Sequence, residues 1–261
     1  MKLFAKGFND LLEGFRLIQH PKLRVFVIIP LIINILVFIG FIWGMSAYFS
    51  GWVDAMVSWL PDWLSFLRWL VWLVFAILVG VLVFYTFVFV ATLVGAPFYG
   101  LLAEQTQKLL TGKEVDEDTP WKQVIMNIPA SVWREVKKFL YYLPRALGLF
   151  VVTFVLSFIP LVNLLSPVLW AVFSSWIMAL EFVDYPADNN KRKIDDVIRF
   201  MRERRSRTLG FGLGVWGSTL IPIVNLVSMQ AAVAGGVKFW LEEHGQLPKA
   251  NPASGAGVAV R

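Results

Sequence analysis

Uncharged stretches of 29 to 35 residues alternate with polar segments along this chain. The four stretches cover residues 25–53, 69–103, 146–180 and 208–237. A helix needs about 20 apolar residues to cross a bilayer core of about 30 Å. Because every stretch exceeds that length, the pattern predicts an all-α integral membrane protein.

Apolar residues also recur at helical spacing before the first stretch. They are Phe4, Phe8, Leu11, Leu12, Phe15 and Ile18. The intervening polar positions are Lys6, Asn9, Asp10, Glu13 and Arg16. The pattern predicts an amphipathic helix within residues 1–24. That helix either lies in the membrane interface or packs on the protein's own polar part.

The first two uncharged stretches predict long helices. Residues 25–53 are long enough for one span, and 69–103 would measure about 52 Å as a single helix. The second helix must therefore project into water or break, and Gly95-Ala96-Pro97 is the expected place for a break. A polar helical region, 104–145, follows it.

A repeated motif lies near the middle of each remaining stretch. Residues 159–166 read Ile-Pro-Leu-Val-Asn-Leu-Leu-Ser, and residues 221–228 read Ile-Pro-Ile-Val-Asn-Leu-Val-Ser. Proline removes a backbone donor, and asparagine favours turns. The motif therefore predicts a helix, a turn and a second helix in each stretch, whereas a simple kink is the alternative. About 13 uncharged residues precede each motif, which is about 20 Å of helix and less than a full crossing.

The distribution of Lys and Arg favours hairpins that enter the membrane partway. Five occur in 1–24, one in 50–68, seven in 104–145 and eight in 181–207. With two full spans and two re-entrant hairpins, every basic segment lies on one side, as the positive-inside rule requires. If the third stretch crossed fully, residues 181–207 would lie on the other side.

These features predict one membrane domain over residues 1–244 and a disordered tail, 245–261, rich in Gly, Ala and Pro. The domain's expected parts are an interfacial helix (1–24), a first span (25–53), a second long helix (69–103), a polar helical region (104–145), a first hairpin (146–180), a polar basic helix (181–207) and a second hairpin (208–237).

Composition narrows the function. Charged residues make up 16% of the chain, below the roughly 25% of soluble domains. The net charge of +6 is explained by basic segments flanking the apolar stretches, so no nucleic-acid partner is expected. There is no cysteine and there are only two histidines, and enzyme signatures are absent. We therefore expect no catalytic residue, no metal and no cofactor. Gly210 and Gly214 have the small-xxx-small spacing of closely packed helices.

Several short elements carry a family resemblance. They are Gly7-Phe8-Asn9, Pro21 to Arg24 with Pro30, Gly95-Ala96-Pro97, Arg134-Glu135, Tyr141 to Ala146, Ile159-Pro160 with Asn163, Asp184-Tyr185-Pro186 with Asn189, Gly210-Phe211-Gly212, and Ile221-Pro222 with Asn225. In order and spacing they resemble the CysZ-type sulfate permeases of bacterial inner membranes, over residues 5–243. The resemblance implies a multi-pass inner-membrane protein, assembled as a homo-oligomer in the lipid bilayer, with two long spanning helices and two hemi-penetrating hairpins.

The resemblance also implies sulfate uptake for cysteine biosynthesis, with sulfite and related oxyanions as further candidate substrates. The family's sulfate site is a Gly-Leu-Arg-like element before the first span, which here reads Lys22-Leu23-Arg24. Lysine thus replaces the glycine and adds a positive charge. Free amides at a helix N-terminus together with the Arg24 guanidinium suit a dianion. Alternatively, Lys22 and Arg24 anchor the helix at lipid phosphates.

Polar residues at the edges and turns of the apolar stretches are candidates for lining a pathway, because charges near the membrane interior tend to pair or to mark a route. They are Glu104, Arg134, Glu135, Arg145, Asn163 and Asn225. Snorkelling, salt bridges and turn capping are the alternatives. These features together predict a sulfate permease, and the main alternative is a non-transporting assembly or regulatory protein of the membrane. An integral membrane enzyme is disfavoured by the lack of catalytic groups.

Overall fold

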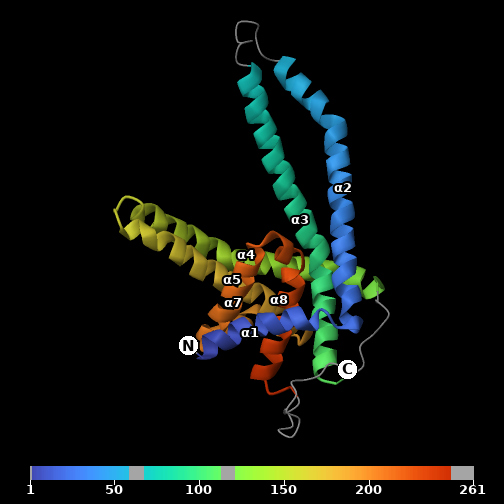
Figure 1. The fold of residues 1–261 in the computed structure, drawn as a ribbon, viewed down its shortest axis with the longest axis vertical. Coiled ribbons are helices and arrows are strands. Elements are labelled where there is room, and N and C mark those ends of the chain that lie inside the picture. The colour runs from blue at the N-terminus through green and yellow to red at the C-terminus, as the bar shows by residue number, and fades with distance from the viewer. Residues whose placement is uncertain (1, 59–67, 113–120, 248–261) are drawn as a thin grey trace. The chain divides into compact units, whose positions relative to one another are not determined.

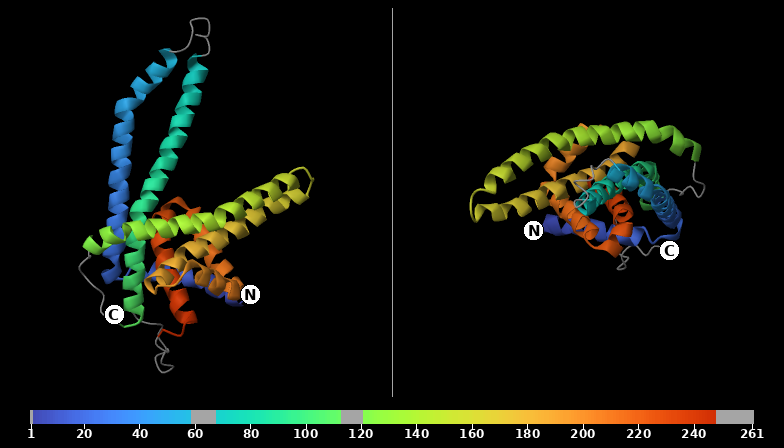
Figure 2. Two further views of the ribbon diagram at one scale, coloured as in Figure 1. Left: turned by 180° about the vertical axis from the view of Figure 1, so that it is seen from behind. Right: turned by 90° about the horizontal axis from the view of Figure 1, so that it is seen from above.

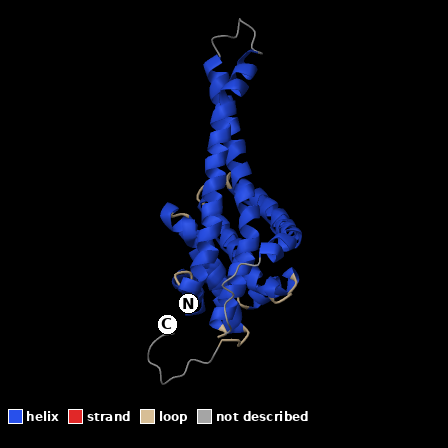
Figure 3. Cartoon of the chain, turned by 90° about the vertical axis from the view of Figure 1, so that its right-hand side faces the viewer, coloured by secondary structure: helices blue, strands red, loops and turns tan. Residues whose placement is uncertain are grey.

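The computed structural model describes residues 2–58, 68–112 and 121–247, and within these ranges the regular structure is helical, without strands (Figure 1, Figure 3). The helices are α1 (Lys2–Leu17), α2 (Pro21–Ser58), α3 (Arg68–Leu110), α4 (Trp121–Leu156), α5 (Leu165–Asn189), α6 (Ile194–Glu203), α7 (Arg205–Thr219) and α8 (Pro222–Glu243), with a short 3-10 helix at Val162–Leu164. The all-α prediction is confirmed.

Four helical stretches among the described residues are long and apolar enough to cross a membrane. They are Pro21–Gly44, Val132–Leu156, Val162–Asn189 and Pro222–Glu243. The long helix expected over 69–103 lies within α3, which has 43 residues and measures about 65 Å. These lengths confirm an integral membrane protein built from helices.

Two units make up the chain. One contains residues 1–28 and 97–261, and the other contains residues 29–96. The second unit consists of parts of α2 and α3. The first unit holds α1 and α4 to α8 together with the start of α2 and the end of α3, and it contains most of the buried residues.

The expected break at Gly95-Ala96-Pro97 is wrong, because α3 continues as a helix to Leu110. Projection of this helix into water stays a prediction, and residues 101–103 near its end are buried in the first unit. Polar side chains do not stop a helix, since Lys, Glu and Gln are good helix formers.

Other expected boundaries also shift for this reason. Residues 104–145 divide between α3 and α4, and α4 runs on through residue 145 to Leu156. The single basic helix expected over 181–207 is wrong, because this segment contains the end of α5, all of α6 and the start of α7. Most of the predicted tail, residues 248–261, lies outside the described residues.

Both copies of the repeated motif lie at turns between helices. α4 and α5 form a long helical hairpin, seen clearly in Figure 2, which turns at Ser157–Leu161 and the 3-10 helix. α7 and α8 turn at Leu220–Ile221, and Pro222 occupies the first position of α8, where its missing N–H costs nothing. The prediction that the motif marks helix–turn–helix units is confirmed. The depth of these hairpins in a membrane stays a prediction.

Helices α1, α5, α7 and α8 pack against one another through glycine. A Cβ at Gly7 of α1 would lie 2.0 Å from the carbonyl oxygen of Arg207 in α7, and one at Gly14 would lie 2.0 Å from that of Ala231 in α8. A Cβ at Gly212 of α7 would lie 1.7 Å from the carbonyl oxygen of Ser175 in α5. Such contacts require backbones that approach more closely than any side chain permits. We call these contacts the glycine seams.

The N-terminal helix lies across α7 and α8 (Figure 1). Its buried face is the small-residue side, with Gly7, Leu11 and Gly14, whereas Phe8 and Leu12 stay exposed. Of the two sequence alternatives, the structure has the one in which this helix packs on the protein itself. Location in the membrane interface stays a prediction, which the exposed apolar side chains favour. The spacing of Gly210 with Gly214 does place small residues against α1, as expected.

Replacing Gly212 with alanine is expected to lower the free energy of unfolding by about 1–3 kcal/mol, because overpacking forces the α5–α7 backbones apart. The matched control is Gly217→Ala in the same helix, where no atom lies within 4 Å of the added Cβ. The control should be neutral or stabilising by up to about 1 kcal/mol, since alanine favours helix. Thermal midpoints in detergent measure both, and equal midpoints would contradict the close packing.

Candidate functional site

Lys22, Leu23 and Arg24 form the first turn of α2, directly after Pro21. Leu23 is fully buried, while the Lys22 and Arg24 side chains are exposed. The Arg24 Nε donates a hydrogen bond to the Gln19 carbonyl at 2.9 Å. This bond holds the guanidinium back toward the N-terminal end of the helix, where Lys22 lies.

The backbone amides of this turn are already bonded to His20. Lys22 N–H donates to His20 Nδ1 at 3.3 Å. The amides of Leu23 and Arg24 donate to the His20 carbonyl at 2.9 and 3.2 Å. Pro21 has no N–H, so His20 caps the helix and satisfies its first donors. The expectation of free amides at this site is therefore wrong, and only the ammonium and guanidinium groups stay candidates for binding an anion.

A second group of charges joins α4 to α5, in the parts of these helices that lie away from the turn between them. We call it the α4–α5 charge cluster, and it consists of Arg134, Glu135, Lys138, Glu181, Asp184 and Asp188. Arg134 donates to both carboxylate oxygens of Asp184, at 2.8 and 2.7 Å, a bidentate pairing. It also pairs with Asp188 at 2.7 Å.

Lys138 is the centre of the cluster. Its side chain is only 1% exposed, and its Nζ lies 2.7 Å from Glu135 and 2.8 Å from Glu181. The Nζ also lies 5.2 Å from the centre of the Tyr185 ring. With four carboxylates and two cations, the cluster holds an excess of two negative charges. Both cations are therefore held by more than one carboxylate and cannot bind an anion at full strength.

The structure brings together only two of the six predicted pathway residues, Arg134 and Glu135. Glu104 pairs with Lys108 at 2.9 Å on α3. Arg145 bonds the Tyr141 carbonyl, and its guanidinium lies over the Tyr141 ring at 3.7 Å. None of these contacts reaches the α4–α5 charge cluster.

Asn163 and Asn225 lie at the turns of the two hairpins, and both are exposed. Neither the 3-10 helix nor α8 has a side-chain hydrogen bond at its N-terminal cap. The N-cap residues are Leu161 and Ile221, whose apolar side chains cannot bond a backbone amide. Turn capping and a role in a pathway therefore both stay predictions for the two asparagines.

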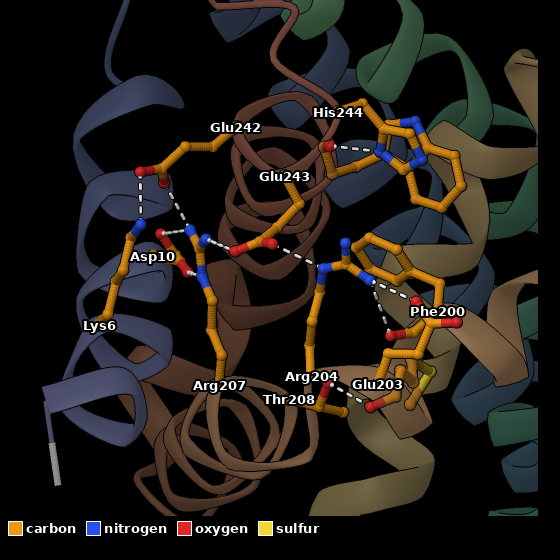
Figure 4. A network of polar contacts seen from close by, with 12 residues as sticks. Lys6, Asp10, Phe200, Glu203, Arg204, Arg207, Thr208, Glu242, Glu243 and His244 are labelled. Carbon is orange, nitrogen blue, oxygen red and sulfur yellow. Dashed lines mark hydrogen bonds and ion pairs between the residues drawn. The ribbon is translucent and has the colours of Figure 1, made fainter.

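Sequence reasoning missed a buried group of charges that joins α1 to α7 and α8 (Figure 4). Arg207 donates to both oxygens of Asp10, at 2.7 and 2.9 Å, and each side chain is 1% exposed. Arg207 also pairs with Glu242 and Glu243, each at 2.5 Å. The sequence pattern places Asp10 on the polar face of the amphipathic helix. Its spacing from Gly7 and Gly14, at helical intervals of three and four residues, was the signal for a shared buried face.

The pKa values of this buried pair shift for identifiable reasons. Burial lowers the pKa of Arg207, but the hydrogen bonds and charges of Asp10 and Glu242 outweigh it and raise the pKa overall. Burial raises the pKa of Asp10 above its ordinary value, and the Arg207 partner only partly offsets it. Arg207 therefore stays charged, and its partners are needed to keep that charge stable.

Comparison with known proteins gives the family. The chain matches the model of the family described as sulfate transporter CysZ/etoposide-induced protein 2.4 over residues 10–229. It is similar to proteins named sulfate transporter CysZ from Pseudomonas fluorescens (strain Pf0-1; 43% identity over 92% of this chain and 94% of the relative) and from Pseudomonas aeruginosa (strain LESB58; 45% identity over 90% and 94%). A protein of the same name from Vibrio parahaemolyticus is 35% identical over 91% of this chain and 94% of its own length.

The chain belongs to this family. The resemblance found in the sequence is thus confirmed, and the chain is a multi-pass bacterial membrane protein. Family membership accounts for the hydrophobic pattern but assigns no role to individual side chains. Among the described residues, no group of three or more His, Asp and Glu is arranged to hold a metal ion.

Arg207→Met is expected to lower the free energy of unfolding by about 3–5 kcal/mol, because it leaves the buried Asp10 carboxylate without its partner. The double variant Asp10→Asn with Arg207→Met should recover part of that loss, since no uncompensated charge then remains at this position. Arg205→Met, which removes an exposed charge from the same helix, is the control and should stay within about 0.5 kcal/mol. Thermal melts in detergent compare the three variants. A loss for Arg207→Met no larger than for the control would refute the buried pair.

Proposed function

We propose that this protein transports sulfate across the bacterial inner membrane and so supplies sulfur for cysteine biosynthesis. The observation that carries the proposal is the match, over about nine-tenths of the chain, to relatives named sulfate transporter CysZ. The apolar helices and the charges between α4 and α5 are compatible with this role. Sulfite and related oxyanions share the negative charge and the acceptor oxygens of sulfate and are further candidate substrates.

Lys22 and Arg24 are the proposed ligands for sulfate before it enters the membrane. Both side chains are exposed, and the bond from Arg24 to Gln19 directs the guanidinium toward the helix start. A guanidinium offers paired donors, which suit an oxyanion. Because His20 occupies the amides, Leu23 contributes by fixing the turn through its buried side chain. The lysine that replaces the family's glycine supplies charge instead of close backbone approach.

The α4–α5 charge cluster is the proposed part of the pathway. A transported ion must bind strongly enough to enter and weakly enough to leave. Arg134 and Lys138 attract a dianion, while Asp184 and Glu181 already compensate them. The carboxylates thus weaken the hold on sulfate and keep the cations in position. Glu104, Arg145, Asn163 and Asn225 are further candidates for lining the route.

The hairpins are proposed to enter the membrane partway and return. Their turns carry no charge and expose large apolar side chains: Leu161 and Ile223 are each 82% exposed. Water is a poor environment for such turns, and lipid is a suitable one. The turn backbone also bonds within itself, as in Asn163 N–H to the Ile159 carbonyl at 3.2 Å and Asn225 N–H to the Ile221 carbonyl at 2.8 Å. Internal bonding is what a medium without water demands.

The length of the first hairpin supports the same proposal. Between the charge cluster and the turn, α5 has residues 165–180, which span about 24 Å, less than a bilayer core of about 30 Å. Leu161 has a φ of 68°, a conformation that normally favours glycine. An apolar side chain is thus kept at the tip despite local strain. The apolar surfaces of α4 and α5 are then available for lipid and for the other subunits of a homo-oligomer.

Radiolabelled sulfate uptake into liposomes that contain only this protein tests the transport proposal. We expect saturable uptake, reduced about tenfold by Arg24→Ala with Lys22→Ala, because charge-assisted hydrogen bonds to the anion are lost. Arg16→Ala removes an exposed charge from the nearby helix α1 and is the control, expected to match the unaltered protein. No uptake by correctly folded protein would reject transport and favour the assembly or regulatory role. Uptake that the double variant leaves unchanged would assign Lys22 and Arg24 to membrane anchoring.

Single cysteines at Gly112 and Lys193 test the hairpin topology. The chain has no native cysteine, so each substitution gives one label site. With the α4–α5 hairpin entering and returning, an impermeant thiol reagent should label both positions from the same side of oriented vesicles. A cysteine at Leu161 should stay unlabelled until detergent is added, because lipid covers it. Labelling of the first two positions from opposite sides would refute the re-entrant hairpin.

A further inference from the structure

A surface pocket of about 240 Å³ lies between α6 and the end of α8. One wall is a single face of α6, on which Asp196, Arg199, Phe200 and Glu203 lie at helical spacing. Arg192, in the turn before α6, adds to the rim. Drug-sized ligands occupy about 300–1,000 Å³, so this pocket suits a smaller ligand.

The floor of the pocket is aromatic. His244 stacks on Phe200 with ring centres 5.2 Å apart, and Trp240 lies 4.1 Å from His244. The Phe200 and Trp240 side chains are buried, so this floor is rigid and apolar. Charges beside such a surface are screened less than charges surrounded by water, which strengthens their attraction for a ligand of opposite sign.

Two guanidinium groups in this pocket are uncommitted. Arg204 is already engaged, with Glu203 at 3.0 Å and Glu243 at 2.6 Å. Neither Arg192 nor Arg199 makes a side-chain hydrogen bond or ion pair within the described part of the chain. With Glu203 neutralised by Arg204, these two cations face one carboxylate, Asp196. The pocket therefore has a positive excess where the α4–α5 charge cluster has a negative one.

The backbone that carries Arg192 is held in place. Its N–H donates to the Ala187 carbonyl at 2.9 Å, and its own carbonyl accepts a bond from Arg134 Nη2 at 3.1 Å. The preceding residue, Lys191, has a φ of 55°, so the turn has a defined and unusual shape. Arg134 thus contacts both the α4–α5 charge cluster and the turn that presents Arg192.

We propose that this pocket is a second anion site, which binds a tetrahedral oxyanion between Arg192 and Arg199. The ligand chemistry is that of free sulfate or of the phosphate in a lipid headgroup, since both offer oxygens that a guanidinium binds with paired donors. This site is separate from the one proposed at the start of α2. Binding of an oxyanion in the pocket does not depend on whether the protein transports sulfate. Its link to Arg134 connects it physically with the proposed pathway.

Equilibrium binding of radiolabelled sulfate to the purified full chain in detergent tests this site. The Arg24→Ala background removes the guanidinium of the first proposed site and so weakens that site relative to the pocket. In that background, Arg192→Gln with Arg199→Gln is expected to weaken sulfate binding at least about tenfold, because charge-assisted bonds are lost. The control is Lys191→Gln with Arg202→Gln, which also removes two positive charges, one from the same turn and one from α6, at residues that do not line the pocket. This control should stay within about twofold.

Equal binding by the pocket pair and the control pair would overturn the proposal, as would the absence of saturable binding in the Arg24→Ala background. Thermal midpoints verify that the variants fold. If the pocket pair fails to fold, the single variant Arg199→Gln decides, since Arg199 is exposed on α6. A loss of about threefold or more supports the site, and unchanged affinity overturns it. Because binding is measured apart from uptake, a failure of transport leaves this result readable.

Nanodiscs distinguish the two sources of oxyanion. If the phosphate of an anionic headgroup occupies the pocket, the unaltered protein should bind sulfate more weakly in nanodiscs with phosphatidylglycerol than in nanodiscs of phosphatidylcholine alone. The Arg192→Gln, Arg199→Gln variant should bind sulfate equally in both. If free sulfate is the ligand, its affinity for the unaltered protein should be the same in both lipids. Competition that persists in the pocket pair would place the lipid elsewhere and overturn the headgroup assignment.

Discussion

The close approach of α1, α5, α7 and α8 is the constraint on which the rest of the first unit depends. Glycine permits this approach, because a Cβ at Gly7 or Gly212 would overlap the backbone of the neighbouring helix. The short separation brings Asp10 within bidentate reach of Arg207 and excludes water from the pair. It also fixes the end of α1, which only three residues separate from the start of α2. The position of Lys22 and Arg24 at the start of α2 thus depends on the contacts that α1 makes.

Charges in this protein fall into three groups with different balances. The Asp10–Arg207 pair is saturated and buried, as a structural contact requires. The α4–α5 charge cluster has more carboxylates than cations, which suits a region where an anion must not be held tightly. The α6–α8 pocket has two guanidinium groups left over beside an aromatic floor. Arg134 belongs to the cluster and also donates to the backbone carbonyl of Arg192, which lines the pocket.

The hydrophobic pattern was a reliable guide to helices and an unreliable guide to their ends. Long uncharged stretches and the Pro–Asn motif predicted the long helices and the turns correctly, because both reflect local backbone chemistry. The predicted break at Gly95-Ala96-Pro97 failed, since α3 is continuous there, and the single helix over 181–207 failed, since turns divide that segment among α5, α6 and α7. The apolar pattern also ends before α3 and α5 do, because charged residues with high helix propensity let these helices continue. For the site, the family resemblance pointed to the Lys22 to Arg24 turn, and polar positions at the edges of the apolar stretches pointed to Arg134 and Glu135, which do lie together in the fold. These signals missed Lys138, whose partners come from two helices, and His20, whose ring and carbonyl occupy the amides expected for an anion.

By itself, the sequence determined that this is a helical membrane protein, where its hairpins turn and which family it resembles. These properties depend on the hydrophobic effect and on backbone preferences, which act along the chain and can be read in order. Only the tertiary structure decided that α1 packs on α7 and α8, that Asp10 and Arg207 form a buried pair 197 residues apart, and that Arg192 and Arg199 share a pocket with Trp240. The first two depend on which helix faces cross at glycine, and the third on how α6 lies against the end of α8. All three are decided by packing in three dimensions.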